Sequence, residues 1–182
     1  MKKAWGAFHK YKKVLTNKHI GIGKRLRFFA TVVSATALFG CATWTITAQR
    51  EQRISSTFGQ MMRKMINVKP TENETYVEWR SRASRIAHYH QKRSGIRTWV
   101  TEQRSKKWEW AGHVLRREDS RWSRNCLLSW SHEVRRVGRQ RKRWSDDLED
   151  FVRTLPGHLN WKHLAKDREV WYAHKPDYVG NV

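Results

Sequence analysis

The residues with the clearest potential for chemistry are two adjacent aspartates, Asp146 and Asp147, which follow Trp144 and Ser145. Neighbouring carboxylates could hold two divalent metal ions, as they do in a polymerase palm. That arrangement needs a hairpin of apolar strands, whereas the residues before Trp144 are Arg-Gln-Arg-Lys-Arg. The residues that follow have a helical period, with Ser145 placed as N-cap and the acids in the first turn. The pattern therefore favours a helix ending at Pro156 over a catalytic site.

The spacing of the histidines in the sequence predicts neither a catalytic site nor a metal site. Among the nine histidines, none pairs with a second ligand and a carboxylate at helical spacing, and His88 and His90 would point apart on a helix. His113 has no orienting carboxylate or nucleophile nearby in the sequence. We interpret Gly112 as a small helical residue that allows another backbone to approach, with His113 beside it at the surface or in a polar contact. We expect no metal, no cofactor and no catalytic residue.

The chain has two cysteines, Cys41 and Cys126, both in apolar surroundings and without CxxC spacing. This usage fits neither a disulfide framework nor a zinc ribbon. It is typical of a reducing compartment, so we expect a nuclear or cytoplasmic protein.

The charge balance indicates a polyanionic partner. The 182 residues include 38 Lys and Arg against 16 acids, which gives a net charge of +22. Residues 1–27 carry nine basic residues and no acid, whereas residues 145–182 carry five basic and seven acidic residues. The positive surface therefore ends near Trp144. We expect RNA or DNA as partner and no small-molecule substrate, and the oligomeric state stays open.

The segment RRVGRQRKRW, residues 135–144, is the most basic stretch, with six cations in ten residues. It has no helical or strand period, so we expect an extended, solvated loop. Guanidinium groups fork hydrogen bonds to phosphate and release counterions on binding. A plain solvated charge run or a nuclear-import signal would look similar. The predicted nucleic-acid-binding residues are Arg135, Arg136, Arg139, Arg141, Lys142 and Arg143, helped by Arg116, Arg117, Arg121 and Arg124.

The tryptophans divide into two groups by their neighbours. Four lie on apolar stripes and are predicted to be core: Trp110, Trp130, Trp161 and Trp171. Three adjoin basic residues and could stack on unpaired bases, although a core position is favoured for them too: Trp108, Trp122 and Trp144.

Helical periodicity dominates most of the chain. One apolar stripe covers residues 54–66, and a second helix after Pro70 would be capped by Thr71 or Thr75, with Tyr76, Trp79, Ala83, Ile86 and Ala87 on one face. Further helices are predicted at Val100–Arg116, at Ser120–Trp130 with a face of Trp122, Cys126, Leu127 and Trp130, and from an Asn160 cap through Tyr172. The expected fold is mostly α, a small helical bundle with a basic loop.

Phe28–Gln49 has no charged residue, and its length of 22 residues suits a membrane span. Its content of Thr, Ser, Ala and Gly favours a buried helix or a strand-turn pair in a soluble core instead. A small basic protein anchored in a membrane by residues 28–49, with basic flanks on anionic lipid, is the alternative.

Several segments, in this order and spacing, resemble the carboxyl-terminal tail that follows the reverse transcriptase of LINE-type (non-LTR) retrotransposons. They are WEWAGHVLRREDSRWSRNCLLSW, RRVGRQRKRWSDDLEDF and NWKHLAKDREVW. Upstream, KRLRFFATVVSATALFGCATWTIT is similar to the helix and turn after the palm, and MMRKMINVKPTENE is similar to the connecting piece. The resemblance covers Ile20 to Trp171. Gln140 stands where the family usually has proline.

The resemblance implies a fragment of a larger polymerase in which the tail helps to hold template RNA or target DNA. A chain of this length could not contain the family's polymerase and endonuclease domains, so we expect neither activity. The implied division is a basic segment at 1–19, a thumb-like segment at 20–70, a helical nucleic-acid-binding tail at 71–173 and an extension at 174–182. A translated remnant of a retroelement that does not fold stably is a further alternative.

Overall fold

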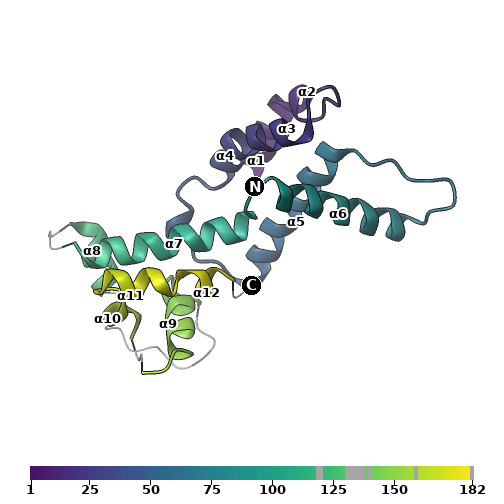
Figure 1. Cartoon of the computed structure of the whole chain (residues 1–182). Coiled ribbons are helices and arrows are strands. Elements are labelled where there is room, and N and C mark those ends of the chain that lie inside the picture. Colours follow the sequence, from purple (N-terminus) through teal and green to yellow (C-terminus); the bar gives the residue numbers. More distant parts are fainter. Residues whose placement is uncertain (118–120, 130–137, 139–140, 158–159, 181–182) are drawn as a thin grey trace. The chain divides into compact units, whose positions relative to one another are not determined.

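The computed structural model describes residues 1–117, 121–129, 138, 141–157 and 160–180 (Figure 1). Within these ranges the regular elements are helices and no strand occurs, so the predicted mostly α fold class is confirmed. The chain forms two compact units, Met1–Phe39 with Ala48–Glu102, and Gly40–Thr47 with Gln103–Val182. These units are defined by packing, whereas the four predicted segments rest on charge and resemblance. The predicted division stays a prediction.

The first unit is helical throughout its described core. Its elements are α1 (Lys2–Lys10), α2 (Lys12–Leu15), α3 (Ile22–Phe29), a π-helical turn (Ala30–Ser34), α4 (Ala35–Ala37), α5 (Ala48–Ile66), α6 (Tyr76–Arg93) and the start of α7 (Trp99–Leu115). The predicted stripe on α5 is confirmed, because Ile54, Phe58, Met61, Met62 and Met65 are all buried. The ring of Trp99 stacks on Phe29 at 6.0 Å and meets Phe58 edge-on at 5.5 Å. Its Nε1 donates to Ser34 Oγ at 2.8 Å.

The uncharged segment at 28–49 is broken into short elements. The helical stretch of α3, the π-helical turn and α4 ends at Ala37, and Gly40 follows with a φ of 65°, which favours glycine. Phe29, Val33 and Leu38 are buried, as the core interpretation predicted. Among the residues that the structure describes, no helix combines the length and apolarity needed to cross a membrane.

Arg25 shows that the basic amino-terminal segment is not all surface. Its side chain is 7% exposed, and it donates to three carbonyls: Ile20 at 2.8 Å, Leu15 at 3.1 Å and Met65 at 2.5 Å. Burial lowers the pKa of the guanidinium. The hydrogen bonds satisfy the buried donors and join the chain around α2 and α3 to the end of α5.

A capping box at Thr75 fixes the start of α6. Thr75 Oγ1 accepts from the N–H of Glu78 at 3.4 Å, and Glu78 Oε2 accepts from the N–H of Thr75 at 2.9 Å. Of the two predicted caps, the structure selects Thr75. The predicted buried face is right for Ala83 and Ala87 but wrong for Tyr76, which is 67% exposed in the first turn.

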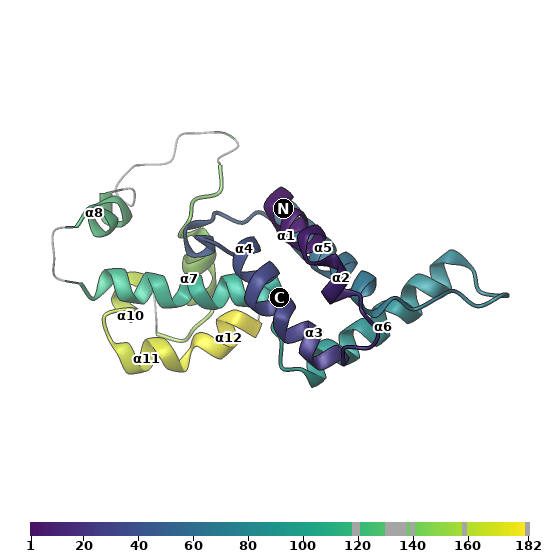
Figure 2. The same cartoon turned by 90° about the horizontal axis from the view of Figure 1, so that it is seen from above.

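The second unit contains the rest of α7, a short 3-10 turn (Cys41–Thr43), α8 (Trp122–Ser129), α9 (Asp146–Arg153), α10 (Trp161–Leu164), α11 (Arg168–Ala173) and α12 (Lys175–Gly180). Figures 1 and 2 both show α11 and α12 alongside α7. The prediction of one helix from Asn160 to Tyr172 is wrong. Asn160 does cap a helix, but Asp167 Oδ1 accepts from the N–H groups of Glu169 and Val170 at 2.9 and 3.1 Å and starts a new one.

The predicted apolar face of α8 is also only partly right. Leu127 packs against the core of the second unit, but Trp122 is 82% exposed and Cys126 is exposed. Trp130 lies outside the described residues. Helix α8 therefore contributes little apolar contact besides Leu127, and its Trp122 ring faces solvent.

Candidate nucleic-acid interface

Two tryptophans form the centre of the second unit. The rings of Trp108 and Trp171 stack with centroids 3.7 Å apart and planes at 7°. Each indole donates to the other's backbone carbonyl, Trp108 Nε1 to Trp171 O at 2.9 Å and Trp171 Nε1 to Trp108 O at 3.0 Å. Both side chains are completely buried. Base stacking is therefore excluded for Trp108, and its favoured core position is correct.

Gly112 lies directly against this pair. A Cβ at Gly112 would be 2.5 Å from Trp171 Nε1 and 2.7 Å from Trp171 Cδ1. The expected need for a small residue is therefore confirmed, although an indole ring rather than a backbone makes the close approach. His113 is exposed, which is the first of the two positions expected for it.

Lys107 is a site residue that the sequence interpretation missed. Its side chain is 1% exposed, and its ammonium donates to Trp144 O and, at 2.5 Å, to Asp147 Oδ1. The ammonium also lies 4.7 Å from the centroid of the Trp144 ring. Burial lowers the pKa of Lys107, and the charge of Asp147 opposes this shift. The spacing from Lys107 to Ala111 and Val114 was the available signal, since all three lie on the buried side of α7.

The acids that begin α9 are engaged with their surroundings. Asp147 also accepts from Tyr178 OH at 3.1 Å, and Asp146 Oδ2 accepts from the N–H of Arg143 at 2.8 Å. Ser145 occupies the predicted N-cap position, but its hydroxyl donates to Glu149 Oε1 at 2.9 Å and makes no capping bond. The acidic first turn is therefore as predicted, while the capping role of the serine side chain is not.

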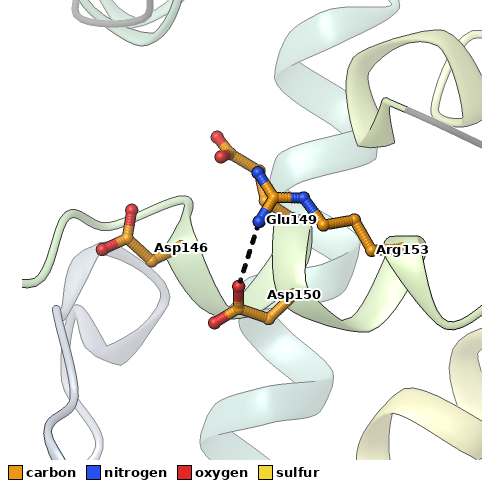
Figure 3. A pocket seen from close by; sticks show the side chains of 4 residues that line it. All are labelled: Asp146, Glu149, Asp150 and Arg153. Atoms are coloured by element: carbon orange, nitrogen blue, oxygen red, sulfur yellow. Dashed lines mark ion pairs between the residues drawn. The ribbon is translucent and has the colours of Figure 1, made fainter.

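A shallow acidic hollow lies along α9, lined by Asp146, Glu149, Asp150 and Arg153 (Figure 3). Arg153 Nη1 lies 3.8 Å from Asp150 Oδ1, and Figure 3 shows Asp146 apart from this pair. Within the described ranges, no three His, Cys, Asp or Glu side chains are grouped so that they could hold a metal ion. The arrangement is that of a solvent-facing helix surface with one ion pair.

The described end of the basic segment is attached firmly to the second unit. Arg141 and Lys142 are exposed, Arg143 is half-buried, and all three lead directly into Trp144. The Trp144 indole donates to Ala42 O at 2.8 Å, and its carbonyl accepts from Lys107. Three other predicted contact residues, Arg135, Arg136 and Arg139, lie outside the described residues. The structure therefore fixes the position at which this segment joins α9.

The four predicted helper arginines differ in their surroundings. Arg116 Nη1 donates to Ala165 O at 2.8 Å, so this half-buried side chain ties the end of α7 to α10. Its guanidinium also lies 6.0 Å from the ring of Tyr172. Arg117 and Arg124 are half-buried, and Arg121 is exposed. Arg116 thus has a structural contact that the sequence did not indicate.

The two remaining candidates for base stacking, Trp144 and Trp122, differ in how exposed their rings are. Trp144 is half-buried, meets Trp110 and Trp161 edge-on at 5.1 and 6.2 Å, and has Lys107 over its ring. Trp161 is buried as predicted, whereas Trp110 is half-buried. Trp122, at 82% exposure, presents most of its ring to solvent.

Comparison with known proteins gives one informative similarity. No protein-family model matches the chain, and no solved structure matches it. A Caenorhabditis elegans protein described as an uncharacterized transposon-derived protein is 29% identical over 181 residues. The alignment covers 93% of this chain and 60% of the length of that protein. The similarity supports a transposon origin for the chain.

Proposed function

We propose that this chain is a non-catalytic, nucleic-acid-binding part of a non-LTR retrotransposon reverse transcriptase. It holds template RNA or target DNA through the basic segment at 135–143. The observation that carries the proposal is the attachment of this segment: Arg141 and Lys142 are exposed directly before Trp144, which Lys107 and Ala42 hold in place. Cations that project from a fixed point lose less conformational entropy on binding phosphate.

The chain's origin supports the same reading. A transposon-derived relative and the resemblance of the segments at 108–171 to a retrotransposon tail agree with one another. Nucleic acid is also the abundant polyanion that would match a net charge of +22. The carboxylates of α9 already serve the helix start and the Lys107 pair, so the proposal assigns them no catalytic role.

The test is binding to a hairpin RNA and to duplex DNA across a salt series. A variant with alanine at all six basic positions of the segment is compared with wild type. If about six phosphates are neutralised, log K should fall with log salt at a slope of about −4 to −5, and the variant should lose most of that slope.

A matched variant controls for total charge. Six exposed lysines of the amino-terminal segment are replaced by alanine: Lys2, Lys3, Lys10, Lys12, Lys13 and Lys18. This variant has the same net charge as the segment variant, and it should keep most of the affinity. Equal losses in the two variants, or no measurable binding by wild type, would contradict the proposal.

A further inference from the structure

The outer face of α6 has an exposed tyrosine surrounded by basic side chains. Tyr89 is 56% exposed and lines a shallow hollow of about 380 Å³ with Arg82, Arg85 and Ile86. The spacings of three and four residues place these side chains on one side of the helix. The hollow therefore combines a flat aromatic ring with two guanidinium groups at its edge.

Two interactions hold the edges of this hollow. Arg82 forms a bidentate pair with Glu74, with Nε to Oε1 at 2.7 Å and Nη2 to Oε2 at 2.5 Å, and Nη2 also donates to Lys69 O at 2.9 Å. On the other side, Arg93 Nη1 donates to Tyr89 OH at 2.9 Å. The Tyr89 ring and the Arg82 guanidinium are thus oriented before any ligand binds, which lowers the entropy cost of binding.

The charged side chains that α6 places around Tyr89 are basic, and Glu74 beside the hollow is already paired with Arg82. Arg85, Lys92 and Arg93 are exposed, and none of them forms an ion pair with a residue that the structure describes. The single acidic residue of α6, Glu78, is in the first turn, where its carboxylate accepts a hydrogen bond from the N–H of Thr75. Like charges on one helix face repel each other, and a bound polyanion would relieve this repulsion.

We propose that this face of α6 binds single-stranded nucleic acid. One base stacks on the Tyr89 ring, and the flanking phosphates contact Arg85, Lys92 and Arg93. A phosphate-only surface would not need the exposed ring, and a duplex keeps its bases stacked inside, so the combination fits a single strand. The site lies in the first unit, whereas the basic segment lies in the second. It therefore does not depend on the function proposed above.

The test measures binding of the full chain to an oligo-dT strand and to a duplex of equal length. Tyr89→Ala should weaken oligo-dT binding about 5- to 150-fold and leave duplex binding unchanged, because only the single strand offers a base. Tyr89→Phe keeps the ring and should bind oligo-dT nearly as well as wild type. Arg85→Ala with Lys92→Ala should reduce the salt slope for oligo-dT by about 1.4.

Tyr76→Ala is the matched control, because Tyr76 is a tyrosine of the same helix with 67% exposure that lies outside the hollow. It should change oligo-dT affinity less than twofold. The proposal is overturned if Tyr89→Ala binds oligo-dT like wild type, or if Tyr76→Ala loses as much affinity as Tyr89→Ala. It is also overturned if polyglutamate competes with labelled oligo-dT as well as unlabelled oligo-dT does. If the variant with alanine at the six basic positions of residues 135–143 loses duplex binding, the function proposed above is supported. The proposal for α6 is decided by the Tyr89→Ala result.

Discussion

Trp108 and Trp171 exchange hydrogen bonds while their rings stack, so each indole satisfies its N–H on the backbone of the other's helix. The pair joins α7 to α11 through two residues that are 63 positions apart in the chain. Phe151 and Tyr178 pack against the Trp108 ring at 5.5 and 4.6 Å. This pair therefore connects α7, α9, α11 and α12 into one core.

Gly112→Ala is expected to destabilise the second unit. The added Cβ would lie 2.5 Å from Trp171 Nε1, and the ring cannot retreat because it is buried and hydrogen-bonded. Overpacking of this kind costs about 1–3 kcal/mol. Urea unfolding followed by circular dichroism would measure it. Gly6→Ala is the control: Gly6 is in α1 with nothing within 4 Å of its Cβ position, so that change should stabilise the protein slightly.

The buried pair of Lys107 and Asp147 should respond asymmetrically to mutation. Asp147→Asn leaves an ammonium that is 1% exposed without its counter-ion and should cost about 3–5 kcal/mol in free energy of unfolding. Lys107→Met leaves an aspartate that is 26% exposed and still accepts from Tyr178, so the loss should be smaller, about 1–3 kcal/mol. Chemical denaturation would compare the two variants.

The double variant and a surface control complete this test. Lys107→Met with Asp147→Asn should cost less than the sum of the single changes, because neither partner is then left alone. Asp150→Asn removes a carboxylate that is 71% exposed and pairs with Arg153 at 3.8 Å, so it should change stability by less than about 0.5 kcal/mol. Strict additivity would show that the two charges do not interact.

The sequence predicts the longest helices, α5, α6 and α7, because local patterns determine them. The stripe on α5 and the cap at Thr75 depend on residues three or four apart, and both are found in the structure. Lys107 is harder to recognise, although its spacing to Ala111 and Val114 gives a local signal. Its burial depends on Trp144 and Asp147, about forty residues later, and an adjacent Lys106 makes it look like part of a solvated charge run.

The helix break before α11 and the location of Trp108 also depend on contacts between residues that are far apart in the sequence. Asp167 can begin a helix or sit within one, and the choice depends on whether Trp161 and Trp171 must both reach the core. Trp108 follows two lysines, so the sequence left base stacking open beside the favoured core position, and the core position is decided by a residue from another helix. The basic segment was evident from composition alone, and its binding role stays a prediction.

Acid should weaken the contribution of Glu74 to the first unit. Hydrogen bonds from Arg82, together with the N–H of Thr71, lower the pKa of Glu74 from 4.5 to about 2. Because the folded-state pKa is depressed, the stabilisation is present above pH 4.5 and is lost as the pH falls towards 2. Wild type should melt at a higher temperature than Glu74→Gln at neutral pH, and the difference should close at acid pH.

Glu72→Gln is the control for this titration. Glu72 is exposed, and no hydrogen bond or ion pair of its side chain is recorded with the described part of the chain. Its substitution should leave the melting temperature within error of wild type across the pH range. A Glu74→Gln difference that stays constant down to acid pH would show that the carboxylate's charge is not the cause.

Trp122→Ala should separate binding from stability. The ring is 82% exposed, so its loss should change the free energy of unfolding by less than about 0.5 kcal/mol. If the ring stacks on an unpaired base, affinity for single-stranded RNA should fall about 5- to 150-fold, with duplex DNA unaffected. Trp122→Leu keeps an apolar side chain without the aromatic face and should behave like Trp122→Ala. Restored affinity in the leucine variant would mean that Trp122 contributes apolar contact and does not stack on bases.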